Sequence, residues 1–212
     1  MLEGVTRFAR LEWFFWKLVR SMEAVPRWDN DDHPVHTKEN VLQHSFKTWM
    51  LTLLVTLLER RSGNKDLDLA WLMVRAPSHD FEESCGIGDK PYLVRRDPRV
   101  KKLFDELGEK LIAMFLDQYL PSEIAAELFT LFTSDAGHEK EARLFYCIEH
   151  IGYVTFALYE IQEAKNQTFY KVLGDHLDTL DQGAKEFPFS IGAIWTHGMR
   201  PTVLELLGNK PK

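Results

Sequence analysis

Apolar residues recur every three or four positions along most of the chain, which is the spacing of amphipathic helices. The first such pattern predicts a helix over residues 5–22. After a polar stretch, Asn40 is expected to cap a second helix that runs to about residue 61. One face of the first helix is expected to be apolar and to carry Phe8, Leu11, Phe14, Phe15 and Leu18.

A third helix is expected to start near residue 67 and to include His79 and Asp80. Pro77 is placed to kink this helix, because proline cannot donate the helical hydrogen bond. The glycine-containing residues 84–97 are predicted to form a loop.

The second half of the chain continues the helical pattern. Asp97 as cap and Pro98 in the first turn predict a helix to about residue 119, and Pro121 begins another. Residues 139–164 form the longest periodic stretch, and one or two shorter helices are expected after it.

No segment of useful length alternates apolar and polar residues with the period of two that strands show. No linker divides the chain. The pattern therefore predicts an all-α fold, a helical bundle. A single domain is expected to span residues 1–212, with the carboxyl-terminal helices in residues 161–212.

The composition narrows the class of protein. Hydrophobic residues make up 45% and charged residues 27%, as in globular proteins. The net charge of −6 argues against binding to a nucleic acid polymer, which needs a basic face. Two cysteines are too few for a disulfide framework and fit a cytoplasmic location. Charged residues interrupt the apolar stretch "LEWFFWKLV", so we expect a core helix there and no membrane span.

Several residues that can bind a metal fall inside apolar helical patterns. His44 lies in the second helix, His79 and Asp80 in the third, and Glu149 in the long late helix. A buried ionised carboxylate is costly unless it is paired or bound to a cation. Because facing helices of a bundle often build such sites, we expect these side chains to converge on one metal ion.

The order of these residues resembles the H…HD…D pattern of HD-domain metal-dependent phosphohydrolases. Three further blocks resemble the bacterial 5′-deoxynucleotidases of that superfamily. "VPRW" is similar to their I-P-R-W, "ENVLQHS" to their E-N-V-x-x-H-S, and "HDFEESCGIGDKP" to their H-D-x-x-E-x-x-x-G-D-x-P. The resemblance covers roughly residues 11–160, in the right order.

The resemblance implies an HD-domain bundle with a mononuclear metal site held by His44, His79, Asp80 and Glu149. Such a donor set suits one divalent transition metal. Co²⁺ or Mn²⁺ is favoured, with Ni²⁺, Fe²⁺, Zn²⁺ or Mg²⁺ as alternatives. HD phosphodiesterases with two metals need further histidines between the HD pair and the last acid. Between Asp80 and Glu149 this sequence has only His138, which favours a single metal and disfavours a phosphodiesterase.

The resemblance also implies roles for the residues around the metal. Arg27 can grip a phosphate with its guanidinium fork, and Trp28 can pack on the base or sugar. Glu83 and Asp89 are expected to assist catalysis by positioning water or protonating the leaving oxygen. Lys90 is a further candidate for substrate binding; with Arg95 and Arg96 it forms a basic cluster that could hold a β- or γ-phosphate.

The sequence departs from the family pattern at two places. Position 149 is glutamate where the family has aspartate, so the metal or the helix must shift to accommodate the longer side chain. One extra residue also stands between Glu83 and the Gly88–Asp89 pair, which affects where Asp89 lies.

Ordinary structural roles compete with these assignments. Arg27 could pair with Asp29 or Asp32, and Glu149 with Arg143. The basic cluster could simply be a solvated loop.

The function predicted from the sequence is removal of phosphate from a (deoxy)nucleotide, with a 5′-monophosphate as the favoured substrate. One alternative is a nucleoside di- or triphosphate phosphohydrolase that acts stepwise or releases triphosphate, on an unusual nucleoside such as oxetanocin-A, whose HD phosphohydrolase this chain resembles more loosely. Two functions of a different class also stay open: a weakly active nucleotide- or metal-binding regulator, and a structural protein that keeps the fold. The aromatic first helix makes a homodimer a reasonable expectation.

Overall fold

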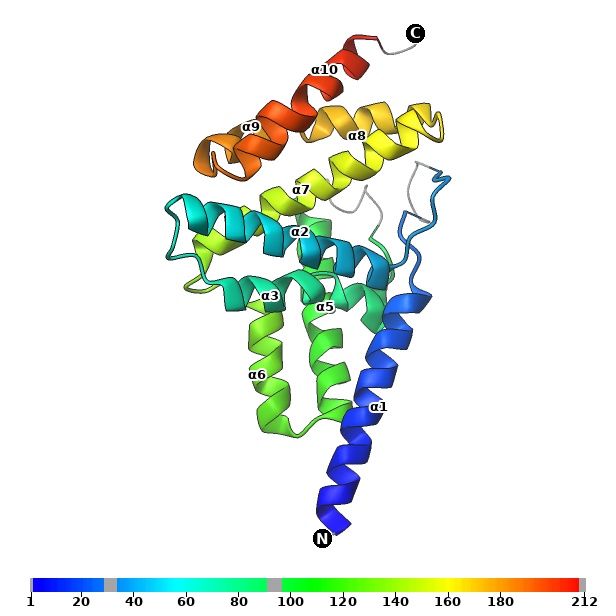
Figure 1. Ribbon diagram of the computed structural model, residues 1–212. Coiled ribbons are helices and arrows are strands. Elements are labelled where there is room, and N and C mark those ends of the chain that lie inside the picture. Colours follow the sequence, from blue (N-terminus) through cyan, green and yellow to red (C-terminus); the bar gives the residue numbers. More distant parts are fainter. Residues whose placement is uncertain (1, 29–33, 91–96, 210–212) are drawn as a thin grey trace. The chain divides into compact units, whose positions relative to one another are not determined.

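The computed structural model describes residues 2–28, 34–90 and 97–209, and their side chains from residue 12 onward (Figure 1). Within these ranges the regular structure is helical, and β pairing is limited to a single antiparallel bridge between Pro26 and Asn40. The predicted all-α class is therefore confirmed. Arg95 and Arg96, Asp29 and Asp32, and the side chains of Phe8 and Leu11 lie outside the described part of the chain.

The first half of the chain forms α1 (Leu2–Ala24), α2 (Val41–Ser62), α3 (Leu69–Ser78), the π-helical turn η1 (Glu83–Ile87), α5 (Pro98–Tyr119) and α6 (Ser122–Thr133). The second half forms α7 (Glu139–Gln162), η2 (Gln167–Phe169), α8 (Tyr170–Asp175), α9 (Leu177–Glu186), η3 (Ala193–Met199) and α10 (Arg200–Gly208). The prediction of one or two short helices after α7 was wrong, because these elements are too short to show a clear period and depend on packing.

Two helix starts follow the predicted capping chemistry. The Asn40 side chain accepts a hydrogen bond from the Gln43 backbone N–H at 2.9 Å, and the Gln43 side chain accepts one from the Asn40 N–H at 3.1 Å. This reciprocal pair is a capping box, and it starts α2 one turn before His44. Asp97 likewise accepts from the Arg99 N–H at 2.9 Å at the start of α5.

The end of α3 differs from the prediction. The helix stops at Ser78, one residue after Pro77, so His79 and Asp80 lie in the turn that follows and not on the helix. Proline has no N–H for the helical ladder, which weakens the last turn. Part of the predicted loop is also helical, because residues Glu83–Ile87 wind as the π-helical turn η1.

The η1 turn lies where the sequence has one residue more than the pattern it resembles. The Gly88 N–H donates to the Glu83 carbonyl oxygen at 2.9 Å, a bond across five residues that defines a π turn. Gly86 has φ 122° and Gly88 has φ 74°, in the region that favours glycine. Replacing either glycine would strain the turn that leads to Asp89.

The described chain packs as two compact units built from interleaved segments. The first unit contains Met1–Asp32, Lys38–Phe46 and Pro77–Ser134, and the second contains His33–Thr37, Lys47–Ala76 and Asp135–Lys212. A single domain over the whole chain stays a prediction.

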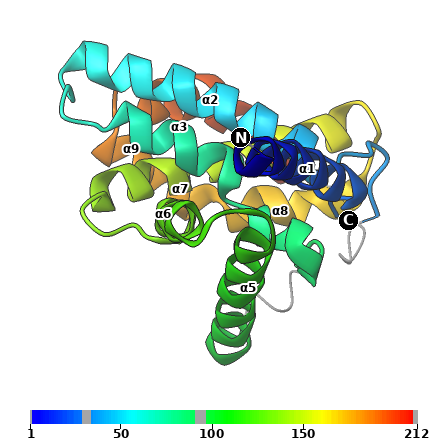
Figure 2. The ribbon, with the colours of Figure 1, turned by 90° about the horizontal axis from the view of Figure 1, so that it is seen from below.

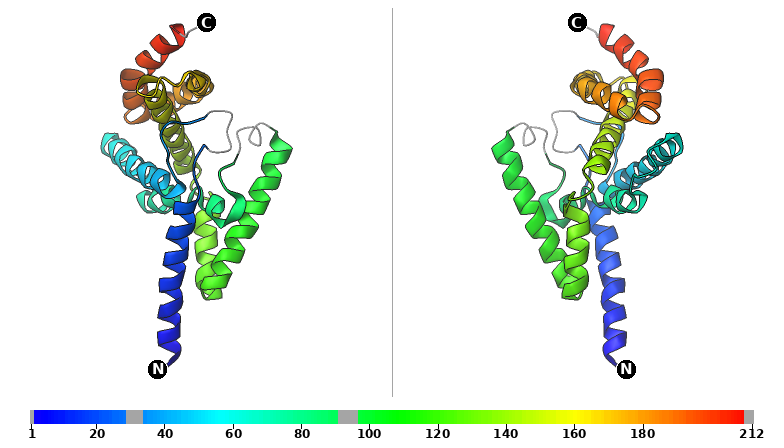
Figure 3. Two further views of the ribbon diagram at one scale, coloured as in Figure 1. Left: turned by 90° about the vertical axis from the view of Figure 1, so that its right-hand side faces the viewer. Right: turned by 90° about the vertical axis from the view of Figure 1, so that its left-hand side faces the viewer.

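The first unit has a core of aromatic and aliphatic side chains. Phe81 is 1% exposed and packs with Leu116 and Ile112 of α5, and Phe14 and Leu18 of α1 cover this cluster. In Figure 3, α5 and α6 meet at their connection and splay apart towards their other ends. Figure 2 shows α6 almost end-on, while α5 is seen along its length. The predicted apolar face of α1 was wrong in one respect.

Phe15 of α1 is 64% exposed, although we predicted it on the buried face. It follows Phe14, which packs into the core of the first unit. Adjacent residues of a helix point about 100° apart, so both cannot face the same core.

No helix in the described ranges has the length and apolar character needed to cross a membrane.

The second unit is organised around α7. Leu144, Ile148 and Ile151 of α7 are nearly inaccessible, and α8 and α9 pack along this helix (Figure 1). The approach of α9 is close because it presents Gly183. A Cβ atom at that position would lie 2.4 Å from the sulfur of Cys147.

We expect Gly183→Ala to lower the free energy of unfolding by about 1–3 kcal/mol, because the added methyl group overpacks the contact with Cys147. Urea denaturation followed by circular dichroism measures the change. Gly152→Ala is the matched control, since a Cβ there meets no atom within 4 Å. Its helical position should make it neutral or stabilising. Equal stability of both variants would contradict the close contact.

Candidate metal centre

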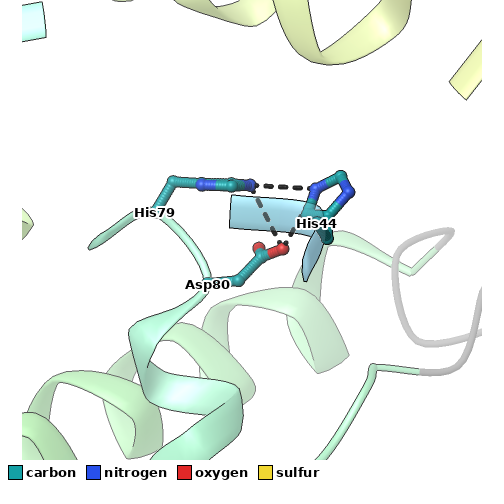
Figure 4. A group of neighbouring side chains, drawn as sticks. All are labelled: His44, His79 and Asp80. Atoms are coloured by element: carbon teal, nitrogen blue, oxygen red, sulfur yellow. Dashed lines mark hydrogen bonds and ion pairs between the residues drawn. The ribbon is translucent and has the colours of Figure 1, made fainter. Parts of the chain in front are cut away.

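Three potential ligands come together within the first unit. His44 is held by the capped start of α2, and His79 and Asp80 are held by the turn that follows α3. In Figure 4 the two imidazole rings and the carboxylate point towards one another. The sequence predicted this convergence, and the structure brings these three of the four predicted ligands together.

The spacing of the three donor atoms fits a metal ion. The Nε2 atoms of His44 and His79 lie 3.2 Å apart. Asp80 Oδ2 lies 3.5 Å from His44 Nε2 and 3.1 Å from His79 Nε2. Ligands bound at about 2.1 Å from a metal lie about 3.0–3.4 Å apart when the bond angles are near 90–109°. Two nitrogens and one carboxylate oxygen also suit a divalent transition metal.

The protonation states suit ligation. Burial lowers the pKa of His44, and the Arg27 guanidinium lowers it further, so this imidazole keeps a free lone pair at neutral pH. Burial alone would raise the pKa of Asp80, but His79 and Arg27 hold that pKa well below its usual range. Asp80 is therefore an ionised carboxylate inside the protein.

Arg27 provides a buried positive charge beside these ligands. Its side chain is 3% exposed, and Nη1 contacts Asp80 Oδ2 and lies 3.3 Å from Glu83 Oε2. The backbone fixes its place, because the Arg27 N–H donates to the carbonyl oxygen of Glu39 at 2.8 Å beside the Pro26–Asn40 bridge. The guanidinium therefore lies in the same group of charges as the donor atoms.

Glu83 is the second buried carboxyl of this group. It is 1% exposed, and its backbone N–H donates to the Asp80 carbonyl oxygen at 3.2 Å. Burial, with the charge of Asp80 beside it, raises the pKa of Glu83 to about 8. The two acids therefore differ in protonation, a division that is common in sites of acid–base chemistry.

Asp89 and Trp28 are joined directly. The Trp28 N–H donates to Asp89 Oδ2, and Trp28 has φ 68°, a left-handed conformation that costs a bulky residue about 1–2 kcal/mol. The Asp89 carboxylate supports this strained turn. The structure thus brings the predicted substrate-binding tryptophan next to the predicted catalytic aspartate.

Lys90 is engaged in an ion pair. Its Nζ lies 2.8 Å from Glu82 Oε1 and 3.7 Å from Asp105 Oδ1 of α5. Burial alone would lower the pKa of Lys90, but Glu82 raises it, so the side chain stays cationic. These contacts give Lys90 a structural role, and its part in substrate binding stays a prediction.

Glu149 lies on α7, in the second unit. Arg143, which the sequence offered as its partner, has Nε 2.7 Å from Glu186 Oε1. The role of Glu149 as fourth ligand stays a prediction. The next residue, His150, contacts His176 through their Nδ1 atoms at 2.8 Å.

Cys85 lies in the η1 turn, close in sequence to the site. Burial raises the pKa of its thiol to about 12, with a further contribution from Glu82. A raised pKa keeps the thiol protonated and so makes it a poor nucleophile at neutral pH.

Glu39 is the residue that sequence reasoning did not assign. It is buried, and its Oε2 lies 3.8 Å from Nδ1 of His44, on the side of the ring opposite the donor atoms. The "ENVLQHS" block contained the signal, since Glu39 opens that block and His44 lies near its end.

The sequence of this chain matches a known protein family. The family described as 5′-deoxynucleotidase YfbR-like matches residues 14–187, which is most of the chain. This chain belongs to that family. It is therefore an HD-type hydrolase, a metal-dependent phosphohydrolase. The family predicted from the motif order is confirmed.

A solved structure supports the fold. The crystal structure of an HD-domain phosphohydrolase from Listeria innocua matches with a TM-score of 0.78 and 17% identity, over 94% of this chain and 93% of that one. At this identity the likeness shows the fold alone. No curated protein matches this chain.

We expect His79→Ala to weaken Co²⁺ binding by about 100-fold or more, since residues that only support a metal ligand already change affinity about 10- to 100-fold. Titration of metal-stripped protein with Co²⁺ measures the affinity. His138→Ala is the control, because that ring stacks on Trp71 at 5.0 Å and lies outside the donor group. Wild-type affinity in His79→Ala, with an intact fold, would remove His79 from the ligands.

Proposed function

We propose that this enzyme removes the 5′-phosphate from a deoxynucleoside monophosphate with the help of one divalent transition metal, with Co²⁺ or Mn²⁺ favoured. The observation that carries the proposal is the metal-sized triangle of His44, His79 and Asp80 donors with the Arg27 guanidinium against it. Membership of a 5′-deoxynucleotidase family supports the choice of substrate.

His44, His79 and Asp80 hold the metal in this proposal, and Glu149 completes the set. When bound, the metal supplies a coordinated water of lowered pKa and a positive charge for the phosphate oxygens. Two histidines and carboxylates leave coordination positions for both. Phosphoryl transfer needs mainly positioning and neutralisation of charge, which buried side chains with fixed partners can provide.

Arg27 binds the phosphate of the substrate. Its guanidinium offers several N–H donors in one plane, so it can keep a carboxylate partner while it donates to phosphate oxygens. Trp28, the next residue, is assigned to binding of the nucleoside. Lys90, which follows the η1 turn, is also assigned to substrate binding. The turn that carries Arg27 and Trp28 is fixed by Glu39 and Asp89.

Glu83 and Asp89 assist the chemistry. Glu83 Oε2 lies 3.3 Å from Arg27 Nη1, so a proton on this carboxyl would be held beside the bound phosphate. Asp89 accepts from the Trp28 N–H, and in this proposal its carboxylate positions water or the leaving oxygen.

The remaining assignments follow from the substrate and the surface. A nucleotide substrate and two free cysteines fit a cytoplasmic enzyme. We also propose a homodimer, because Trp13 and Trp16 of α1 are 59% and 52% exposed, and large exposed apolar side chains in a group mark interaction surfaces.

The test of the proposed function is phosphate release by metal-stripped protein after Co²⁺ or Mn²⁺ is added back. We expect metal-dependent orthophosphate from deoxynucleoside monophosphates, with products identified by mass. Deoxynucleoside triphosphates are offered in parallel. Orthophosphate or intact triphosphate from these, without turnover of monophosphates, would contradict the proposal, as would a rate that is independent of metal.

The role of Glu149 has its own test. We expect Glu149→Ala to lower Co²⁺ affinity about 10-fold or more, while Glu149→Asp, which restores the family's residue, keeps it close to wild type. Glu163→Ala serves as the control, because that residue is exposed at the end of α7. Unchanged affinity in Glu149→Ala would remove this residue from the ligand set.

A further inference from the structure

His44 presents its two ring nitrogens to different partners. Nε2 faces His79 and Asp80, at 3.2 and 3.5 Å, and Nδ1 faces the carboxylate of Glu39, at 3.8 Å. Both side chains of this second pair are at most 10% exposed. The ring is therefore held between the donor atoms on one side and a buried acid on the other.

A neutral imidazole carries one proton, and its position decides which nitrogen can bind a metal. A lone pair on Nε2 requires the proton to be on Nδ1. A carboxylate that faces Nδ1 favours this tautomer, because it can accept a hydrogen bond from Nδ1–H and repels the lone pair that would otherwise be there. Asp80 Oδ2 competes for the proton from the Nε2 side at 3.5 Å, but His79 Nε2 lies closer to that oxygen, at 3.1 Å. Glu39 is the acid in that position.

We propose that Glu39 is a positioning residue that selects the Nδ1–H tautomer of His44 and so prepares its Nε2 for the metal; this inference rests on the proposed function. The present separation is about 1 Å longer than a direct N–H···O hydrogen bond. The same contact fixes the angle of the ring, which a ligand at the first turn of α2 needs.

The backbone of Glu39 has a separate task. Its carbonyl oxygen accepts from the Arg27 N–H at 2.8 Å, and the neighbouring Asn40 caps α2. One residue thus connects the phosphate-binding arginine to the metal-binding histidine. Substitution of the Glu39 side chain leaves the backbone hydrogen bond in place, so a side-chain variant tests the carboxylate by itself.

The experiment compares Glu39→Ala and Glu39→Gln by titration with Co²⁺ alone, without nucleotide. We expect Glu39→Ala to lower Co²⁺ affinity about 10- to 100-fold, as for other residues that support a metal ligand. Glu39→Gln should lose less, because its amide oxygen still accepts from Nδ1–H. Lys38→Ala, an exposed neighbour, is the control and should bind as wild type does.

A second readout follows the proton itself. In metal-free wild-type protein, two-dimensional ¹H–¹⁵N spectra of the imidazoles, with His44 assigned by its loss in His44→Ala, should show the proton on Nδ1. In Glu39→Ala the His44 signals should shift towards the other tautomer. A proton on Nε2 in the wild type, or wild-type Co²⁺ affinity in Glu39→Ala, would overturn the proposal. The wild-type spectrum decides even where a variant does not fold.

The two proposals fail in different ways. Loss of the Glu39 effect with retained phosphate release would leave the nucleotidase proposal intact. Absence of phosphate release with an intact Glu39 effect on Co²⁺ binding would leave the positioning role intact and remove the assigned substrate.

Discussion

The ionised carboxylate of Asp80 is the charge on which the surrounding structure depends. It lies inside the protein, where an unpaired charge costs several kcal/mol. Two imidazoles and the Arg27 guanidinium surround it, and their combined field keeps its pKa low in spite of burial. Removing one partner of such a buried group leaves the charge uncompensated and costs about 3–5 kcal/mol, so the partners of Asp80 depend on one another.

The backbone near this charge is shaped at some energetic cost. Trp28 is left-handed, Gly86 and Gly88 have positive φ, and η1 winds as a π turn. Strained residues of this kind persist where the surrounding contacts fix them, and they gather at functional sites. Here the contacts are the Asp89 carboxylate on the Trp28 N–H and the bridge at Pro26. This irregular backbone lets Arg27 reach Asp80 and lets the Trp28 N–H reach Asp89.

Cations near the site have different partners, and this separates their roles. Arg27 contacts Asp80, one of the proposed ligands, so in the proposed function a phosphate on the metal meets its guanidinium. Lys90 contacts Glu82 and Asp105, which ties the η1 turn to α5. A lysine held between two acids has less free charge to offer a polyphosphate. This arrangement is consistent with the proposed monophosphate substrate, which needs a cation close to the metal.

The sequence by itself determined the helical class, the capping of α2 by Asn40 and of α5 by Asp97, and the identity of His44, His79 and Asp80 as neighbours. These features depend on local hydrogen bonding, on helical periodicity and on an ordered set of motifs, all of which are written in short stretches of chain. The sequence did not place the end of α3, the π turn or the short helices after α7, because each depends on packing between distant segments.

Only the tertiary structure showed which partner each charge has. Nothing in the spacing of the residues indicates that Arg27 contacts Asp80, that Asp89 holds the Trp28 backbone, or that Glu39 faces the far nitrogen of His44. Electrostatic pairing acts over a few ångströms in space, and residues 53 or 61 positions apart meet only after the chain has folded. The sequence determined which candidate ligands would meet, and the fold decided their protonation and orientation.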